Sequence, residues 1–204
     1  ASLEEQVEVL RRDWGGRPVW VAGSTHEGED ELVLFAHRRV LARFPEALLI
    51  LVPRHPERFE RVAALVRREQ LRLARRSGPE EYSAQAQVYL GDTMGELPIL
   101  LGSADVAFIG GSLVETGGHN MLEAAARGVP TCFGPHVFNF AAVSQILIEA
   151  GAAVQVADAS ALADQVVAWL EDASRRAEVG EEGRRVVGRN RGALERLMAL
   201  IPPM

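Results

Sequence analysis

Residues 48–56 read LLILVPRHP, in which five consecutive apolar side chains are followed by proline, arginine and histidine. A short apolar run that ends at proline is typical of a strand buried on both faces. Strands of this kind occur in parallel sheets that helices cover on each side. Arg54, His55 and Pro56 are then expected at the carboxyl edge of such a sheet.

The same pattern recurs along the chain, with amphipathic segments between the apolar runs. Further strands are predicted at 19–22, 88–90, 106–109, 131–133 and 153–156, with a weaker one at 71–75. Helices are predicted at 29–44, 57–70, 97–102, 120–127, 140–150 and 161–172. This alternation predicts an α/β protein with a single Rossmann-like, doubly wound parallel sheet.

The two ends of the chain differ from its middle. Residues 3–12 predict a leading helix, and a helical tail is expected at about 174–201. The tail carries four glycines, which predict interruptions near Gly180, Gly183, Gly188 and Gly192. The polar stretch 77–85 predicts a surface loop. Since no linker divides the chain, residues 1–204 are expected to form one domain.

The composition excludes several classes of protein. With 48% hydrophobic and 25% charged residues in 204, the chain is neither disordered, collagen-like nor of low complexity. Its net charge of −6 and its scattered arginines argue against a nucleic-acid partner. The apolar run at 47–52 is far shorter than the roughly 20 residues that span a bilayer, so a soluble chain is expected. Cys132 has no cysteine partner and is expected in the core.

Four of the five histidines follow predicted strands: His26, His55, His119 and His136. The carboxyl ends of parallel strands share one edge of a sheet, where open α/β sheets bind their ligands, so these side chains are expected to converge. Each of them could instead cap a turn. A metal site is disfavoured, because the chain lacks the local ligand spacing of zinc sites.

The glycine-rich segments at 110–112 and 117–118 suggest a phosphate site. Glycine lets the backbone approach a ligand, and the helix predicted to start near Asn120 offers unpaired N–H groups. Neither a G-x-G-x-x-G motif after the first strand nor a P-loop is present, so NAD and P-loop chemistry lose their main support. Arg54 could grip a phosphate or carboxylate, or form an ion pair with Glu57.

Glu123 has two interpretations. Asn120 followed by Glu123 resembles a capping box, which is a structural role that the spacing favours. Alternatively, a carboxylate on the first helical turn accepts hydrogen bonds from the hydroxyls of a sugar.

Six blocks of sequence carry a resemblance to a known family. They are AGSTHEGE at 22–29, LVPRHPERF at 51–59, GDTMGEL at 91–97, GGSLV at 110–114, GGHN at 117–120, and GPH with NF at 134–140. In this order they resemble the signature blocks of the 3-deoxy-D-manno-octulosonic acid (Kdo) transferases.

The resemblance implies a GT-B glycosyltransferase, in which two Rossmann-like domains face each other across a cleft. The C-terminal domain would bind the donor CMP-Kdo, and the N-terminal domain would hold the lipid A precursor and the catalytic carboxylate. The chain resembles the C-terminal half, so no catalytic residue, cofactor or metal is expected in it. Only the missing half would contact the membrane, at the cytoplasmic side of the inner membrane. Half of a UDP-sugar transferase or epimerase, or a non-catalytic anion-binding module, are the alternatives.

The resemblance also implies a set of site residues. Pro53 and Arg54 would meet the CMP phosphate, and Met94, Gly95 and Glu96 would lie beside the cytidine. Asn120, Met121, Leu122 and Glu123 would hold the phosphate and, through Glu123, the ribose, which reverses the preference for a cap. Supporting positions are Ser24, His26, His55, Gly111, Ser112, Gly118 and His119.

Overall fold

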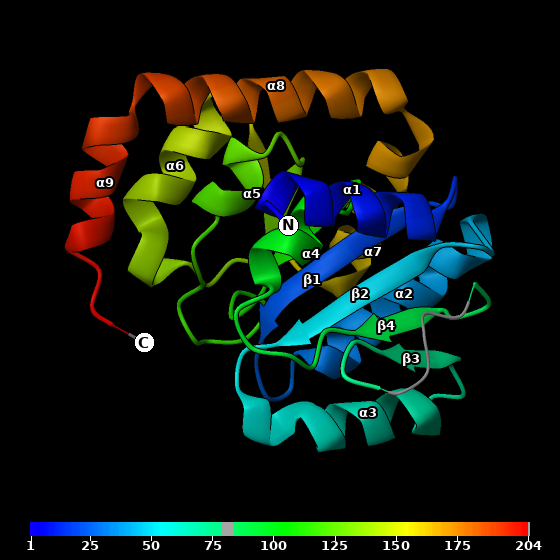
Figure 1. Ribbon diagram of the computed structural model, residues 1–204. Helices are drawn as coiled ribbons and strands as arrows, with labels where there is room; N and C mark the ends of the chain where they lie inside the picture. Colours follow the sequence, from blue (N-terminus) through cyan, green and yellow to red (C-terminus); the bar gives the residue numbers. More distant parts are fainter. Residues whose placement is uncertain (79–83, 204) are drawn as a thin grey trace.

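Seven parallel strands form one sheet in the order β3-β4-β2-β1-β5-β6-β7 (Figure 1). The structure, a computed structural model, describes residues 1–78 and 84–203. The strands are β1 (Val19–Thr25), β2 (Leu48–Pro53), β3 (Leu73–Arg75), β4 (Val88–Leu90), β5 (Val106–Ile109), β6 (Thr131–Phe133) and β7 (Ala153–Gln155). The predicted doubly wound parallel sheet is confirmed, and so is its weak strand at the edge.

Helices cover both faces of the sheet, because successive strand residues point to opposite sides. Val21 and Ile50 pack in one hydrophobic cluster, and their neighbours Trp20 and Leu51 pack in the other. The first cluster includes side chains of α1 (Leu3–Trp14), α4 (Leu97–Gly102), α5 (Leu122–Ala126) and α6 (Ala141–Glu149). The second includes those of α2 (Asp30–Arg43), α3 (Phe59–Arg68) and α7 (Ala159–Glu171). Short 3₁₀ turns η1 (Pro56–Arg58) and η2 (Phe138–Phe140) precede α3 and α6.

The C-terminal tail forms two helices, α8 (Ala173–Arg189) and α9 (Arg191–Ala199), and α8 runs across the top of the molecule in Figure 1. The predicted interruptions near Gly180 and Gly183 are wrong, because α8 continues through both. The predicted interruption near Gly188 and Gly192 is confirmed, since α8 gives way to α9 at Asn190, between these two glycines.

Two glycines of α8 allow the helix to pack closely against its neighbours. A Cβ atom on Gly180 would lie 2.1 Å from the carbonyl oxygen of Gly128, and one on Gly183 would lie 2.8 Å from that of Ala125. A helix can therefore cross the α5–β6 segment closely only where it carries no side chain.

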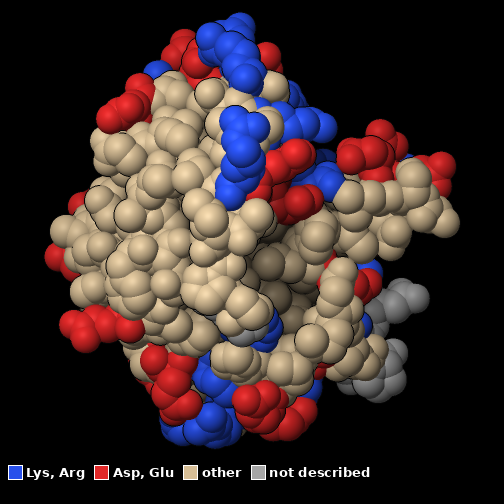
Figure 2. Space-filling view, turned by 90° about the vertical axis from the view of Figure 1, so that its left-hand side faces the viewer, with Lys and Arg blue, Asp and Glu red and all other residues tan. Residues whose placement is uncertain are grey.

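The strand order places a topological switch point at β1. The chain moves from β1 to β2 on one side, and later returns to pair β5 on the other side of β1. Ligands of open α/β sheets bind at such points, beyond the carboxyl ends of the strands. The arrows of β1 and β2 point to the left in Figure 1. Figure 2 views the molecule from that left-hand side and shows a hollow there.

Two further predictions concern the surface and the core. The loop predicted at 77–85 falls largely on residues 79–83, which lie outside the described residues. Cys132 is fully buried in β6, as predicted, and burial raises the pKa of its thiol. In the described part of the chain, no helix combines the length and the apolar character needed to cross a membrane.

Candidate functional site

The loops after β1 and β5 are joined by one buried carboxylate, that of Glu29. Its oxygens accept hydrogen bonds from the backbone N–H groups of Gly111 (2.7 Å), Leu113 (3.0 Å), Ser112 (3.1 Å) and His26 (3.1 Å). Glu29 is fully buried. Burial raises the pKa of its carboxyl group, and the four amide hydrogen bonds oppose this shift because they stabilise the ionised form.

This arrangement corrects the prediction of a phosphate site at 110–112. The N–H groups of Gly111 and Ser112 already donate to Glu29, so these amides are not available to an anion in this structure. The Ser112 hydroxyl is also used internally, since it donates to Ile109 O (2.6 Å) and accepts from the N–H of Gly134 (2.9 Å). Gly111 and Ser112 therefore hold the conformation of the loop through internal hydrogen bonds.

Three of the four predicted histidines meet at the switch point. Nε2 of His26 lies 2.5 Å from Nε2 of His119, with the rings within 8° of parallel and their centroids 4.8 Å apart. Because the two nitrogens lie between the centroids, the rings meet edge to edge in an N–H···N hydrogen bond. The ring of His55 stands against that of His26 with centroids 5.3 Å apart. His136 contributes its backbone N–H to Ser112 O (2.9 Å).

The histidine cluster, defined as His26, His55 and His119, lies in a positive environment. Burial, together with the charges of His55, Arg58 and Arg54, lowers the pKa of His26 to about 4. Burial likewise lowers the pKa of His119 to about 4, together with His26, Arg54 and His55. Arg54 therefore lies within electrostatic reach of both rings, and both are neutral at pH 7.

Backbone geometry at the ends of β1 and β2 holds Arg54 at this edge. The N–H of Arg54 donates to Thr25 O (2.9 Å), and Pro53 pairs with Thr25 at the last position of β2. Ser24 has φ of 57° and is buried, and its carbonyl leaves no room for a side chain at Gly110. The predicted positions 24, 53 and 54 thus meet beside the histidine cluster.

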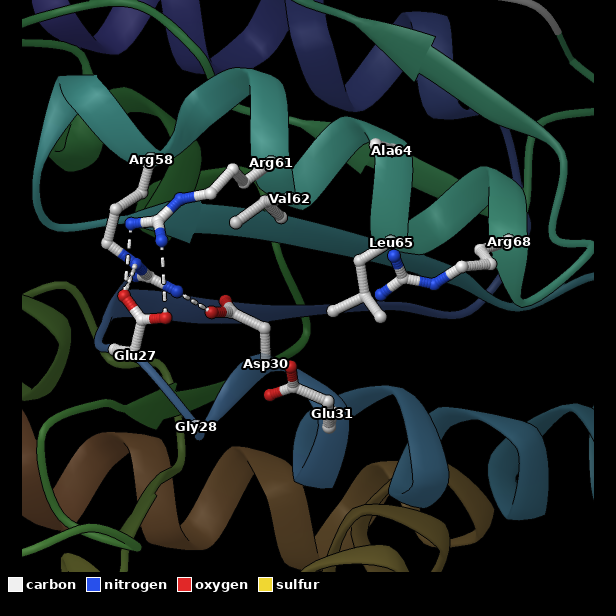
Figure 3. Close-up of a pocket in the computed structure, with 10 residues that line it drawn as sticks. All are labelled: Glu27, Gly28, Asp30, Glu31, Arg58, Arg61, Val62, Ala64, Leu65 and Arg68. Carbon is white, nitrogen blue, oxygen red and sulfur yellow. Dashed lines mark hydrogen bonds and ion pairs between the residues drawn. The ribbon is translucent and has the colours of Figure 1, made fainter.

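Arg58 is a site residue that the sequence analysis did not identify. It is buried and forms an ion pair with the buried carboxylate of Asp30, and it donates to Thr25 O (3.1 Å). Figure 3 shows Glu27 turned toward Arg58 and toward Arg61, at N···O separations of 3.7 and 3.0 Å. These side chains border a cavity of about 240 Å³ between α2 and α3. An arginine among many in an amphipathic segment gives no sequence signal of such burial.

The segment before α5 carries unused backbone donors. Within the described residues, the N–H groups of His119, Asn120 and Met121 have no hydrogen-bond partner. Gly118 has φ of 82° and donates its N–H to Gly111 O (2.8 Å), which orients this segment. The Asn120 side chain accepts from the N–H of Leu122 (2.9 Å). Because Met121 is fully buried, the free amides that an anion could use are those of His119 and Asn120.

Burial and direction limit two of the predicted contacts. Met121 is fully buried, side chain and backbone alike, so it cannot touch a ligand in this structure. Leu122 turns its side chain toward α8 and α9, where it lines a cavity of about 300 Å³ with Val187, Leu194 and Met198.

Glu123 does not complete a capping box. Its Oε1 accepts a hydrogen bond from Nε of Arg127 at 3.0 Å, and Arg127 also contacts Glu4 of α1 at 3.2 Å. The Asn120 side chain bonds the N–H two residues on, where a capping box bonds the third. The capping interpretation is therefore wrong, and Oε2 of Glu123 forms no bond among the described residues.

The loop after β4 lies beside β2 at the same edge. Met94 is 66% exposed at its tip, and Gly95 has φ of 77°, a conformation that favours glycine. Both oxygens of Glu96 accept from Arg76 (3.0 Å each), and the Thr93 hydroxyl also donates to this carboxylate. The bond to Arg76 holds the pKa of Glu96 below its usual value.

The site contains no recognisable metal centre. Among residues 1–78 and 84–203, no group of three or more histidine, cysteine, aspartate or glutamate side chains is arranged to hold a metal ion. What the site offers is imidazole, guanidinium and amide N–H groups at a topological switch point. These groups suit an anionic ligand such as a phosphate ester.

Comparison with known proteins shows first the class of protein and then the family within it. The family model of the group 1 glycosyl transferases matches residues 17–186, so the fold and site belong to that class. Within it, the chain belongs to the family of the 3-deoxy-D-manno-octulosonic acid transferases and corresponds to their C-terminal domain.

Three relatives carry this assignment. The transferase of Haemophilus influenzae is 46% identical over 204 residues, which cover 99% of this chain and 48% of the relative. That of Bordetella pertussis is 41% identical over 190 residues, covering 90% and 44%. The crystal structure of the C-terminal CMP-Kdo binding domain of WaaA from Acinetobacter baumannii is 34% identical, with a TM-score of 0.86, covering 91% of this chain and 97% of that one. The chain thus spans about half the length of the full-length transferases it matches.

Proposed function

We propose that residues 1–204 form the donor-binding domain of a Kdo transferase, which moves Kdo from CMP-Kdo to a lipid A precursor. The observation that supports this most directly is the likeness to the Acinetobacter CMP-Kdo binding domain over nearly its whole length. The carboxyl edge of the sheet agrees with it, because cationic and N–H groups gather there in a chain whose net charge is −6.

Each part of the nucleotide has a proposed partner. Arg54 and the free amides of His119 and Asn120 bind the phosphate. The ribose hydroxyls donate to Oε2 of Glu123, while Arg127 holds the other oxygen. The loop carrying Met94, Gly95 and Glu96 lies beside the cytidine.

In the proposed transfer, a hydroxyl oxygen of the acceptor bonds to the anomeric carbon of Kdo as the bond from that carbon to the phosphate oxygen breaks. Arg54 and the amides stabilise the charge that develops on the departing CMP. The hydroxyl proton goes to a base in the acceptor-binding half, which lies outside this chain. No cofactor or metal takes part, so the full-length enzyme should keep its activity in EDTA.

Calorimetric titration with CMP tests the nucleotide site. The wild-type chain should bind CMP, and Arg54→Ala or Glu123→Ala should abolish the measurable heat. Glu4→Ala is a matched control, because Glu4 shares Arg127 with Glu123 but is exposed on α1. Unchanged CMP binding in both Arg54→Ala and Glu123→Ala would refute the assignment of the site.

Competition separates this proposal from its alternative, half of a UDP-sugar transferase or epimerase. CMP should displace a bound fluorescent cytidine nucleotide at a lower concentration than UDP. A clear preference for UDP would contradict the proposal.

The location of the whole protein is proposed as well. Full-length enzyme should sediment with the inner membrane and act on its cytoplasmic side, with the membrane contact and the lipid A precursor in the other half. This chain alone should bind neither membrane nor nucleic acid. Flotation with vesicles tests whether the chain binds membrane. Residues 1–204 should stay at the bottom of the gradient, and their co-flotation with the vesicles would contradict this prediction.

A further inference from the structure

Among the described residues, the rings of the histidine cluster form no hydrogen bond or ion pair with a carboxylate. The charged and titratable groups that act on His26 and His119 are Arg54, Arg58 and the other histidines of the cluster. All of them oppose protonation, and no carboxylate of the described residues is among them. The same groups would favour an anion placed beside the rings.

The acidic side chains next to the cluster are already engaged. Glu29 accepts four backbone N–H bonds and faces the β5 loop. Asp30 and Glu27 turn toward Arg58 and Arg61 at the α2–α3 cavity (Figure 3). These carboxylates therefore leave the cluster without a counter-charge.

The hydrogen bond between His26 and His119 fixes what the pair can offer. Both rings are neutral, so one ring donates its Nε2–H and the other accepts with Nε2. A neutral imidazole carries one N–H, so the accepting ring carries its proton on Nδ1. The pair thus has one N–H left for a ligand, and His55, which is partly exposed against His26, has another.

The proposed donor carries a second acidic group. An octulosonic acid bears a carboxylate on its anomeric carbon, the atom that is also bonded to the phosphate of CMP. The carboxylate must therefore lie close to the phosphate. His119 carries one of the free amides proposed for the phosphate, so the cluster lies on that side of the phosphate position.

We propose that the imidazole rings of His26, His55 and His119 form a subsite for the carboxylate of the sugar acid, beside the backbone amides and side chains that bind the nucleotide. This inference rests on the proposed function, and it adds the feature by which the enzyme selects an acidic sugar. A donor with a neutral sugar would leave the cluster without an anion.

Titrations with CMP and with CMP-Kdo test the subsite. Wild-type chain should bind CMP-Kdo about tenfold or more tightly than CMP, since charge-assisted hydrogen bonds are strong. In His55→Ala most of this gain should be lost, while CMP affinity stays within about twofold of wild type. His26→Gln, the second variant, should lose the gain in the same way. His136 lies on a neighbouring loop, so His136→Ala should keep the full gain in affinity from CMP to CMP-Kdo.

A spectroscopic measurement adds a readout that a structural role would not change. The ¹⁵N shifts of His26 and His119 should report a higher pKa with CMP-Kdo bound than with CMP bound, because the carboxylate stabilises the protonated ring. Equal weakening of CMP and CMP-Kdo in His55→Ala would show that the cluster holds the nucleotide, and would overturn the proposal. A wild-type chain that binds CMP but gains nothing from Kdo would also overturn it. A wild-type chain that does not bind CMP would instead refute the proposed function.

Discussion

The carboxylate of Glu29 accepts a hydrogen bond from the N–H of Gly111 at 2.7 Å, across 82 positions of sequence. Together with its bonds to Ser112 and Leu113, this contact fixes the β5 loop against the start of α2. The loop leads to Gly118 and His119, which belong to the candidate site. A residue that contacts no ligand in our proposal thus positions the residues that do.

Glu29→Gln should weaken both folding and ligand binding. The amide replaces one acceptor oxygen with an NH₂ group that faces backbone donors, so we expect a loss of about 1–3 kcal/mol of stability. Displacement of the loop should lower CMP affinity about tenfold. Urea denaturation and calorimetry measure the two effects.

Asp105→Asn is the matched control for Glu29→Gln. Asp105 also accepts a backbone hydrogen bond, from Val19 N–H at 3.0 Å, but at the amino-terminal edge of β1. The Asp105→Asn substitution should lower stability and leave CMP affinity unchanged. If both variants lower CMP affinity equally, the effect is general loosening of the fold, and the positioning role of Glu29 is wrong.

Gly180→Ala should destabilise the protein by about 3 kcal/mol, because its Cβ would overlap the carbonyl oxygen of Gly128 and push α8 away. Gly188→Ala is the control in the same helix. A Cβ there meets nothing within 4 Å, so the substitution should stabilise the protein by about 0.5–1 kcal/mol. Thermal unfolding of the two variants measures the contrast, and a similar change in both would contradict the packing argument.

Arg58→Met should cost about 3–5 kcal/mol, because it leaves the buried carboxylate of Asp30 without its cation. Adding Asp30→Asn should recover part of this loss, since the uncompensated charge is then gone. Arg61→Met removes the exposed partner of Glu27 beside the same cavity (Figure 3) and should cost no more than about 1 kcal/mol. Denaturant titration of the three variants measures these losses, and equal losses for Arg58→Met and Arg61→Met would contradict the prediction.

The buried His37 should make stability depend on pH. Its Nδ1 accepts from Trp20 Nε1 (3.0 Å), its Nε2 lies 2.8 Å from Gln87 O, and burial lowers its pKa to about 3. The folded state therefore keeps the ring neutral, while the unfolded chain takes up a proton near its ordinary pKa of 6.5. The stabilisation that the neutral His37 ring contributes is fully present above pH 6.5, and it is lost as the pH falls through 6.5 toward 3.

Urea denaturation between about pH 7.5 and about pH 5 measures this loss, which approaches about 1.4 kcal/mol per pH unit for one such group. His26 and His119 contribute in the same direction, since their pKa values are also lowered. His37→Gln should reduce the slope. A slope that His37→Gln leaves unchanged would show that the ring does not titrate on unfolding.

Local sequence determined the elements and the edge at which the chemistry lies. The strands at 88–90, 106–109 and 131–133 were predicted to the residue, as was the helix at 97–102. Periodicity and turn residues act over a few positions, so they are visible without tertiary contacts. The parallel pattern then placed His26, His55 and Arg54 at one edge. The blocks of resemblance identified the family, which the relatives confirm.

Only the tertiary structure decided which side chain each site residue contacts. His26 meets His119 across 93 positions, and Glu29 takes the amides that the glycine pattern suggested for a phosphate. Gly180 and Gly183 of α8 look like helix breaks in sequence, but the close approach of Gly128 and Ala125 explains them. Hydrogen-bond partners and close backbone contacts depend on residues far apart in the chain, and local spacing carries no information about which of several donors a buried carboxylate will reach.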